Sequence, residues 1–163
     1  MKYVVIATGP SLTDEQVNAV RHMPCVAVSN AYEKAPWAKA LVSADRKWWN
    51  HYKPEFEGLK FSVACVPDVE QVRLVSGSNS GLLGMEVAVK LGATSIILLG
   101  FDMHGSHYFG KHPQPLRNTE PHRFEQFKIQ FRDFRKVPVI NCTPGSSLEC
   151  YPKMSLECAL NSP

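Results

Sequence analysis

The chain alternates short apolar runs with segments of helical periodicity. The apolar runs are bounded by glycine, proline or polar residues and cover residues 2–7, 25–29, 40–43, 59–64, 95–99 and 137–141. Between and after them lie segments with helical patterning, which cover residues 13–22, 46–52, 80–91, 121–134 and 152–160. This alternation is typical of a parallel sheet that is covered on both faces. We therefore predict an α/β fold, a single Rossmann-like domain with a mostly parallel sheet of about six strands and helices on both faces.

Two neighbouring segments carry the strongest part of this pattern. The predicted helix 80–91 has a broad apolar stripe, and Gly92 follows it as a natural C-terminal stop. The strand 95–99 is apolar on both faces, which predicts a central position in the sheet. At the start of the predicted helix 13–22, Thr13 and Gln16 have the spacing of a capping box.

The long segment 102–120 interrupts the alternation. It is rich in histidine, glycine, proline and asparagine, shows no clear period, and is longer than the usual connection inside a compact domain. Loops of this length frequently carry function. We predict that this segment forms an active-site flap.

Length and composition narrow the class of protein. The 163 residues, of which 44% are hydrophobic and 20% charged, suit one globular domain, 1–163. No apolar stretch reaches the roughly 20 residues that a membrane helix needs. The first residues lack the apolar core of a secretory signal, so we expect a cytoplasmic protein without a membrane span. A net charge of +3 with scattered basic residues gives no reason to expect nucleic acid as a partner. The five cysteines include no CxxC pair, which argues against a disulfide framework and a structural zinc site.

Small, polar and titratable residues follow the predicted strands. Ligands of open parallel sheets bind outside the carboxyl ends of the strands, so we expect these residues to form one site. After the first strand, Gly9, Pro10 and Ser11 form a glycine turn that leads into a helix, and the free amides of such a turn suit a phosphate. Residues of the same kind follow other strands or open the helix 80–91, and they are Asn30, Asp45, Ser80, Gly81, Asp102 and Thr143.

Each of these residues also has a purely structural explanation. Ser11 would be favoured as a helix N-cap alone, and Asp45 and Asp102 could cap the segments that follow them. The run 76–81 could be a flexible linker. The three tryptophans are expected to pack in the core and against helices rather than to stack on a base.

The segment 102–120 contains His104, His107 and His112. They lack the i, i+4 spacing of a helical metal site, and glycine-rich surroundings do not fix ligand geometry, so we expect no metal site. A histidine on a mobile loop is better suited to be a phosphate donor or a general base. His122, near the start of a predicted helix, is a second candidate, and a partly exposed helix residue is its structural explanation.

An ordered set of motifs resembles the set found in a known protein family. The set consists of Ile6-Ala7-Thr8-Gly9-Pro10-Ser11-Leu12, Ser29-Asn30, Ser80-Gly81 opening a helix, Leu99-Gly100-Phe101-Asp102, and Thr143-Pro144 with Ser146 and Ser147. In this order it resembles the bacterial sialyltransferases that use a CMP-sugar donor, over about the whole chain. The GPSL turn and the Gly-x-Asp strand end are similar also to the archaeal-type hydroxymethylpterin diphosphokinases and their relatives of unknown function.

The resemblance to the sialyltransferases implies roles around the donor. Gly9, Pro10 and Ser11 would approach the nucleotide phosphate, and Asn30 would contact the donor. The remaining matches would surround the nucleotide, with Ser80 and Gly81 lining its pocket, Asp102 at the rim, and Thr143 and Ser146 touching the base or ribose.

The same resemblance implies a nucleotide-sugar-dependent transferase, most like a CMP-sialic-acid glycosyltransferase. His107 or His122 would remove a proton from an acceptor hydroxyl, and Tyr108 would stabilise the departing phosphate together with helix-end amides. The scheme needs no metal and no cofactor besides the CMP-sugar donor. Its partners would be a nucleotide or nucleotide sugar and a small-molecule or glycan acceptor.

Two other interpretations remain open. One is a diphosphokinase that acts on a pterin-like alcohol, in which Asp45 and Asp102 would hold Mg²⁺ against ATP phosphates. The other is a non-catalytic module that binds a nucleotide without turning it over. The sequence leaves the oligomeric state open, a homo-oligomer included.

Overall fold

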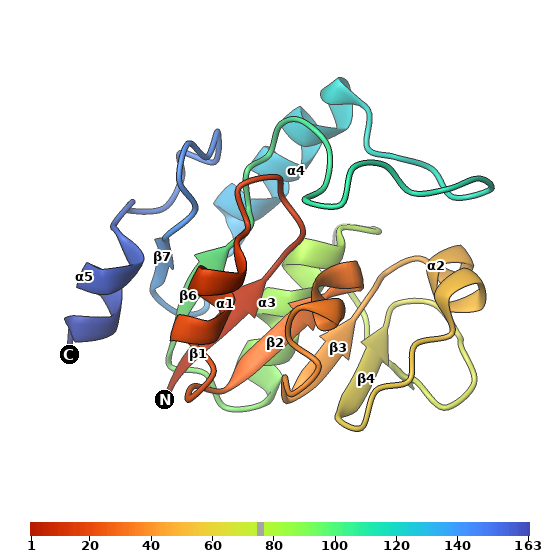
Figure 1. The fold of residues 1–163 in the computed structure, drawn as a ribbon, viewed down its shortest axis with the longest axis horizontal. Helices are drawn as coiled ribbons and strands as arrows, with labels where there is room; N and C mark the ends of the chain where they lie inside the picture. The colour runs from red at the N-terminus through yellow and green to blue at the C-terminus, as the bar shows by residue number, and fades with distance from the viewer. Residues whose placement is uncertain (75–76) are drawn as a thin grey trace.

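A parallel sheet of seven strands runs through the molecule (Figure 1). The computed structural model describes residues 1–74 and 77–163. The sheet has the order β5-β4-β3-β2-β1-β6-β7, and every neighbouring pair is parallel. Its strands are β1 (Lys2–Ile6), β2 (Cys25–Val28), β3 (Ala40–Val42), β4 (Leu59–Ser62), β5 (Glu70–Gln71), β6 (Ser95–Leu99) and β7 (Val139–Asn141). The prediction of an α/β, Rossmann-like fold is confirmed.

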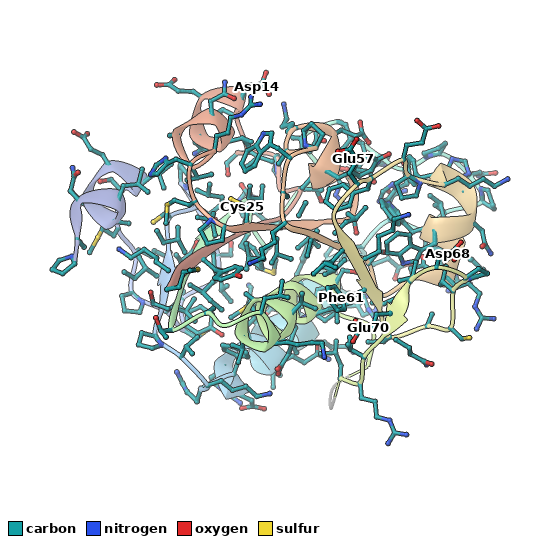
Figure 2. The ribbon with its side chains drawn as sticks, turned by 90° about the horizontal axis from the view of Figure 1, so that it is seen from below. Asp14, Cys25, Glu57, Phe61, Asp68 and Glu70 are labelled. Carbon is teal, nitrogen blue, oxygen red and sulfur yellow. The ribbon has the colours of Figure 1, made fainter. Side chains whose placement is uncertain are left out.

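The prediction of about six strands falls one short, because β5 carries no apolar signal. Its two residues, Glu70 and Gln71, are both exposed and pair with Phe61 and Ser62 of β4. Figure 2 shows Glu70 close to Phe61, where β5 lies beside β4. A short polar strand at a sheet edge is a common protection against pairing with another chain. Such a strand has no hydrophobic periodicity in the sequence by which it could be predicted.

The α-helices follow the predicted segments with changes at their ends, and one short 3₁₀ helix lies in a segment for which no helix was predicted. They are α1 (Asp14–Ala19), η1 (Ser29–Glu33), α2 (Arg46–Tyr52), α3 (Ser80–Lys90), α4 (Pro121–Asp133) and α5 (Leu156–Asn161), of which η1 is a 3₁₀ helix. The capping box of Thr13 and Gln16 is present, and α1 ends three residues before the predicted end. The prediction for the last helix starts too early, because Ser155 is its N-cap and its side chain accepts the N–H of Cys158. None of the described helices is both long and apolar enough to cross a membrane.

Helices cover both faces of the sheet (Figure 2). On one face, Leu83 of α3 and Phe131 of α4 belong to one buried apolar cluster with the sheet. On the other face, Val17 of α1, Trp48 of α2 and Ala159 of α5 belong to a second cluster. Burial of apolar surface on both sides accounts for the interior strands β1, β2, β3 and β6 being largely apolar rather than alternating.

The strand order reverses direction next to β1. The chain proceeds from β1 through β2, β3 and β4 to β5 on one side, and α3 then returns it to β6 on the other side of β1. The segments that follow β1 and β6 stay paired beyond the ends of these strands, because the N–H of Gly9 donates to the carbonyl of Gly100 at 2.8 Å. A reversal of this kind opens a crevice at the carboxyl ends of the two strands. The segment 102–120 leaves β6 at this point and extends toward α2 before it reaches α4 (Figure 1).

Candidate functional site

A cavity of about 230 Å³ lies at the carboxyl ends of the central strands. Its walls come from the ends of β1, β2, β3 and β6, the start of α3, the segment 102–120 and one side of α4. Six of the residues that the sequence singled out for a site line it, and they are Gly9, Asp45, Ser80, Gly81, Asp102 and His107. His104 and His112 line it as well.

Asp102 and Ser11 hold the turn that follows β1. The carboxylate of Asp102 accepts the hydroxyl of Ser11 at 2.9 Å and the amide of Ser11 at 3.2 Å. Asp102 is only 2% exposed, and a Cβ on Gly9 would collide with its carboxylate. Burial raises the pKa of Asp102 above its usual value, and the hydrogen bonds from Ser11 and the nearby His104 oppose this rise.

The Gly-Pro-Ser turn is therefore a structural clamp in this arrangement. The donors of Ser11 are directed at Asp102, and neither Ser11 nor Pro10 lines the cavity. The N-cap of α1 is Thr13 rather than Ser11, and the first turn of this short helix carries Asp14 and Glu15. Two acidic side chains there disfavour a phosphate.

His107 lies against the end of β1. Its Nδ1 is 2.6 Å from the hydroxyl oxygen of Thr8, and its ring stacks on Phe109 with an angle of 3° between the ring planes. Burial and the neighbouring His112 lower the pKa of His107 from 6.5 to about 4. His107 is therefore neutral at pH 7, the form in which an imidazole can accept a proton.

His112 fastens the same segment to α2. Its Nδ1 is 2.8 Å from the hydroxyl of Tyr52, and its ring centroid is 4.5 Å from that of His107. Asn118 accepts the N–H of His112 at 2.7 Å and donates to its carbonyl at 3.3 Å. Burial lowers the pKa of His112, and the nearby Asp45 opposes this effect. The segment 102–120 is thus bound at two points, by His107 to Thr8 at the end of β1 and by His112 to Tyr52 of α2.

The start of α3 forms another wall. The Asn79 side chain caps this helix by accepting the N–H of Leu82 at 3.1 Å, and it donates to Gln130 of α4 at 3.0 Å. The hydroxyl of Ser80 accepts the N–H of Ala44 at 3.0 Å. Since the cap uses the N–H of Leu82, the backbone N–H groups of Ser80 and Gly81 form the positive end of the helix at the cavity.

Aromatic side chains make the apolar part of the cavity. Phe124 and Phe127 of α4 line it and are half-buried, and Phe131 of the same helix meets Phe101 edge to face at 5.7 Å. Arg117 of the segment 102–120 also lines it and is exposed to solvent. The cavity thus combines flat apolar surfaces with a positive helix end, a cation and three histidines.

Asn30 and Tyr108 support the site without lining the cavity. The side-chain oxygen of Asn30 accepts the indole N–H of Trp48 at 2.8 Å, and its backbone carbonyl accepts the hydroxyl of Tyr108 at 2.9 Å. Trp48 itself lines the cavity. Asn30 and Tyr108 hold that wall in place, and their polar groups are used in doing so.

Thr143 and Ser146 bind the backbone of Phe101 rather than the cavity. The hydroxyl of Thr143 accepts the N–H of Phe101 at 3.0 Å, and the hydroxyl of Ser146 donates to its carbonyl at 2.6 Å. His122 is separate from all of these residues. It lies on the first turn of α4, and its side chain is 64% exposed. Its Nδ1 is 3.3 Å from Oε2 of Glu120, and the residue does not line the cavity.

Several cavity residues were given no role from the sequence. Thr8 belongs to the motif of residues 6–12 and directly precedes the glycine turn at a strand end, where ligands bind, but no role was assigned to it. Phe124 and Phe127 are three residues apart on α4 and therefore share a helix face. Met103, which belongs to no motif, and Ser29, the first residue of the Ser29-Asn30 motif, line the cavity with positive φ angles of 59° and 49°, and no sequence pattern indicated these angles. Ser76, in the run 76–81, lies outside the described residues.

Within residues 1–74 and 77–163, no group of three or more histidine, cysteine, aspartate or glutamate side chains is arranged to hold a metal ion. No family model, curated protein or solved structure matches this chain.

Proposed function

We propose that the cavity binds a nucleotide and that the protein is a nucleotide-sugar-dependent transferase with a CMP-sialic-acid type of donor. The observation that carries the proposal is the presence, in one cavity, of neutral His107 and the positive end of α3. The first can take a proton from an acceptor hydroxyl, and the second can stabilise a departing phosphate.

The walls of the cavity suit the two ends of a nucleotide. Phe124 and Phe127 offer apolar rings on which a base can stack. The backbone N–H groups of Ser80 and Gly81 would receive the phosphate, and Arg117 at the exposed side adds a positive charge. A small-molecule or glycan acceptor would enter beside His107.

The transfer step balances with these groups alone. The acceptor oxygen forms a bond to the anomeric carbon while the bond from that carbon to the phosphate oxygen breaks. The proton of the acceptor hydroxyl passes to His107, and CMP leaves with the electron pair of the broken bond. We assign stabilisation of the leaving phosphate to the α3 amides, since Tyr108 donates its hydroxyl to Asn30.

The test separates binding from chemistry. We expect calorimetry to detect CMP binding, and we expect transfer from CMP-sialic acid to a lactose-type acceptor in the presence of EDTA. His107→Asn should lower transfer by about 100-fold or more while CMP still binds. His122→Asn, the same change at an exposed histidine, should leave both unchanged. Absence of CMP binding would overturn the proposal, and binding without transfer would indicate a non-catalytic nucleotide-binding module.

One observation favours a second candidate, the Mg²⁺-dependent diphosphokinase. Asp45 and Asp102 both line the cavity, and Mg²⁺ is commonly held by one or two carboxylates together with substrate phosphates. However, Asp102 already accepts two hydrogen bonds from Ser11, and Asp45 accepts the N–H of Lys47 as the cap of α2. Binding of ATP that requires Mg²⁺, with no binding of CMP, would favour this candidate.

A further inference from the structure

Thr8 binds two consecutive residues of the segment 102–120. Its hydroxyl oxygen is 2.6 Å from Nδ1 of His107, and its backbone carbonyl accepts the N–H of Tyr108 at 2.8 Å. Thr8 lies two residues after the last residue of β1 and is only 8% exposed. The position of His107 is therefore tied to the end of β1, an interior strand of the sheet.

The contacts of the His107 ring leave one nitrogen for the cavity. Thr8 occupies Nδ1, Phe109 stacks on the ring with centroids 4.8 Å apart, and His112 lies beside it. A flip of the ring would break the contact between Nδ1 and Thr8. Among the described residues, no protein group forms a hydrogen bond with Nε2 of His107, and the residue lines the cavity. Nε2 is therefore the atom that can exchange a proton with a bound molecule.

A neutral imidazole carries its one proton on either Nδ1 or Nε2. The hydrogen bond that one nitrogen makes determines which of the two carries the proton. We propose that Thr8 is a positioning residue that accepts the N–H of Nδ1, so that Nε2 of His107 carries the lone pair that takes the acceptor proton. This inference rests on the proposed function and deepens it by assigning the proton to one atom. When Nε2 takes the proton, the bond from Nδ1–H to Thr8 is kept, so the step needs no rearrangement of the ring.

The opposite arrangement has a distinct consequence. If the hydroxyl of Thr8 donated to Nδ1, the proton of neutral His107 would lie on Nε2. The ring would then present a donor to the cavity and would not act as a base. Side-chain ¹⁵N spectra distinguish the two forms, because a protonated and an unprotonated ring nitrogen have well-separated chemical shifts.

The decisive measurement is a two-bond ¹H–¹⁵N correlation spectrum of the free, full-length protein at pH 7, with His107 assigned from the spectrum of His107→Asn. We expect a protonated Nδ1 and an unprotonated Nε2. We expect Thr8→Ser to keep this pattern, and Thr8→Val, which has the same shape without a hydroxyl, to give a mixture of the two forms. A proton on Nε2 in the unaltered protein overturns the inference, whether or not the variants fold.

Kinetics add a readout that lost stability would not mimic. We expect Thr8→Val to lower kcat about three- to tenfold, as the loss of one hydrogen bond implies, with little change in the KM of the donor. Thr8→Ser should restore the rate. The spectrum needs no substrate, so failure of the inference and failure of the proposed function are separate results: absence of CMP binding tests the latter alone. A protonated Nδ1 with equal rates in both Thr8 variants would also overturn the positioning role.

Discussion

The carboxylate of Asp102 accepts both the amide and the hydroxyl of Ser11, a residue 91 positions earlier in the chain. This relationship joins the loop after β1 to the loop after β6, and Asp102 itself lines the cavity. It also explains the glycine at position 9, since any side chain there would occupy the space of the carboxylate. Its strength can be measured by substitution.

We expect Asp102→Asn to destabilise the protein by about 1–3 kcal/mol, because one carboxylate oxygen becomes an NH₂ group that cannot accept a bond from Ser11. Asp45→Asn is the matched control. Asparagine caps a helix as well as aspartate does, so this change at the N-cap of α2 should be nearly neutral. Urea unfolding of both variants measures the difference, and equal stabilities would show that the clamp contributes nothing.

Asp102 also predicts a dependence of stability on pH. Because burial raises its pKa in the folded state, the folded protein holds this proton at pH values where the unfolded chain has released it. The part of the stability that comes from this raised pKa is therefore lost as the pH rises from about 4 through the pKa of the folded state. The difference in unfolding free energy between the unaltered protein and Asp102→Asn should fall over this range, and a constant difference would contradict the raised pKa.

His107 predicts a dependence of the opposite sign. Its pKa is lowered from 6.5 to about 4, so between these values the unfolded chain binds a proton that the folded protein does not. Stability should therefore decrease as the pH falls from 6.5 to 4, and His107→Asn should reduce this decrease. Thermal unfolding at half-unit steps of pH measures it. A titration of His107 near 6.5 by NMR would show that burial does not perturb the ring.

The aromatic wall predicts a loss of nucleotide affinity on truncation. Phe127→Ala should weaken CMP binding by about 1–3 kcal/mol, the usual value of a stacked base. Ile129→Ala is the control, because Ile129 belongs to the same helix but is 52% exposed and does not line the cavity. Calorimetry with CMP compares the two, and equal affinities would remove Phe127 from the binding surface.

Because α3 packs closely on the sheet, we expect a single methyl group added at Gly84 to lower the stability of the protein. A Cβ on Gly84 would lie 2.8 Å from Val5 and 2.9 Å from Val28, so we expect Gly84→Ala to destabilise the protein by about 1–3 kcal/mol. Lys90→Ala, at the exposed end of the same helix, should change stability by less than about 0.5 kcal/mol. If Gly84→Ala left the free energy of unfolding unchanged, the helix would be able to move away from the sheet without losing stability.

The positions of six of the seven described strands along the chain could be predicted from the sequence, because burial on both faces leaves apolar runs that are recognisable without their partners. The strand β5 could not, since its exposed Glu70 and Gln71 gain their strand character from pairing with β4. Local backbone features could likewise be predicted only where the residues that determine them are close together in the sequence. Thr13 and Gln16 are close enough in sequence to reveal their cap, whereas the left-handed Ser29 depends on its surroundings.

The candidate site could be placed at the correct edge of the sheet but not resolved into its parts. Polar residues after strands are expected to converge, and the sequence does not say which of them satisfy one another. Ser11 pairs with Asp102, and Thr143 and Ser146 both bind the backbone of Phe101. These partners are more than 40 residues apart, so only the folded chain reveals that their hydrogen-bonding groups are already used.

The return of the chain through α3 to β6 means that the cavity contains pieces from nearly every part of the polypeptide up to α4. No fragment with only one side of the strand reversal retains both Thr8 and His107. A bound nucleotide would therefore act as a gauge of complete folding, and its affinity would vanish together with the central pairing of β1 and β6.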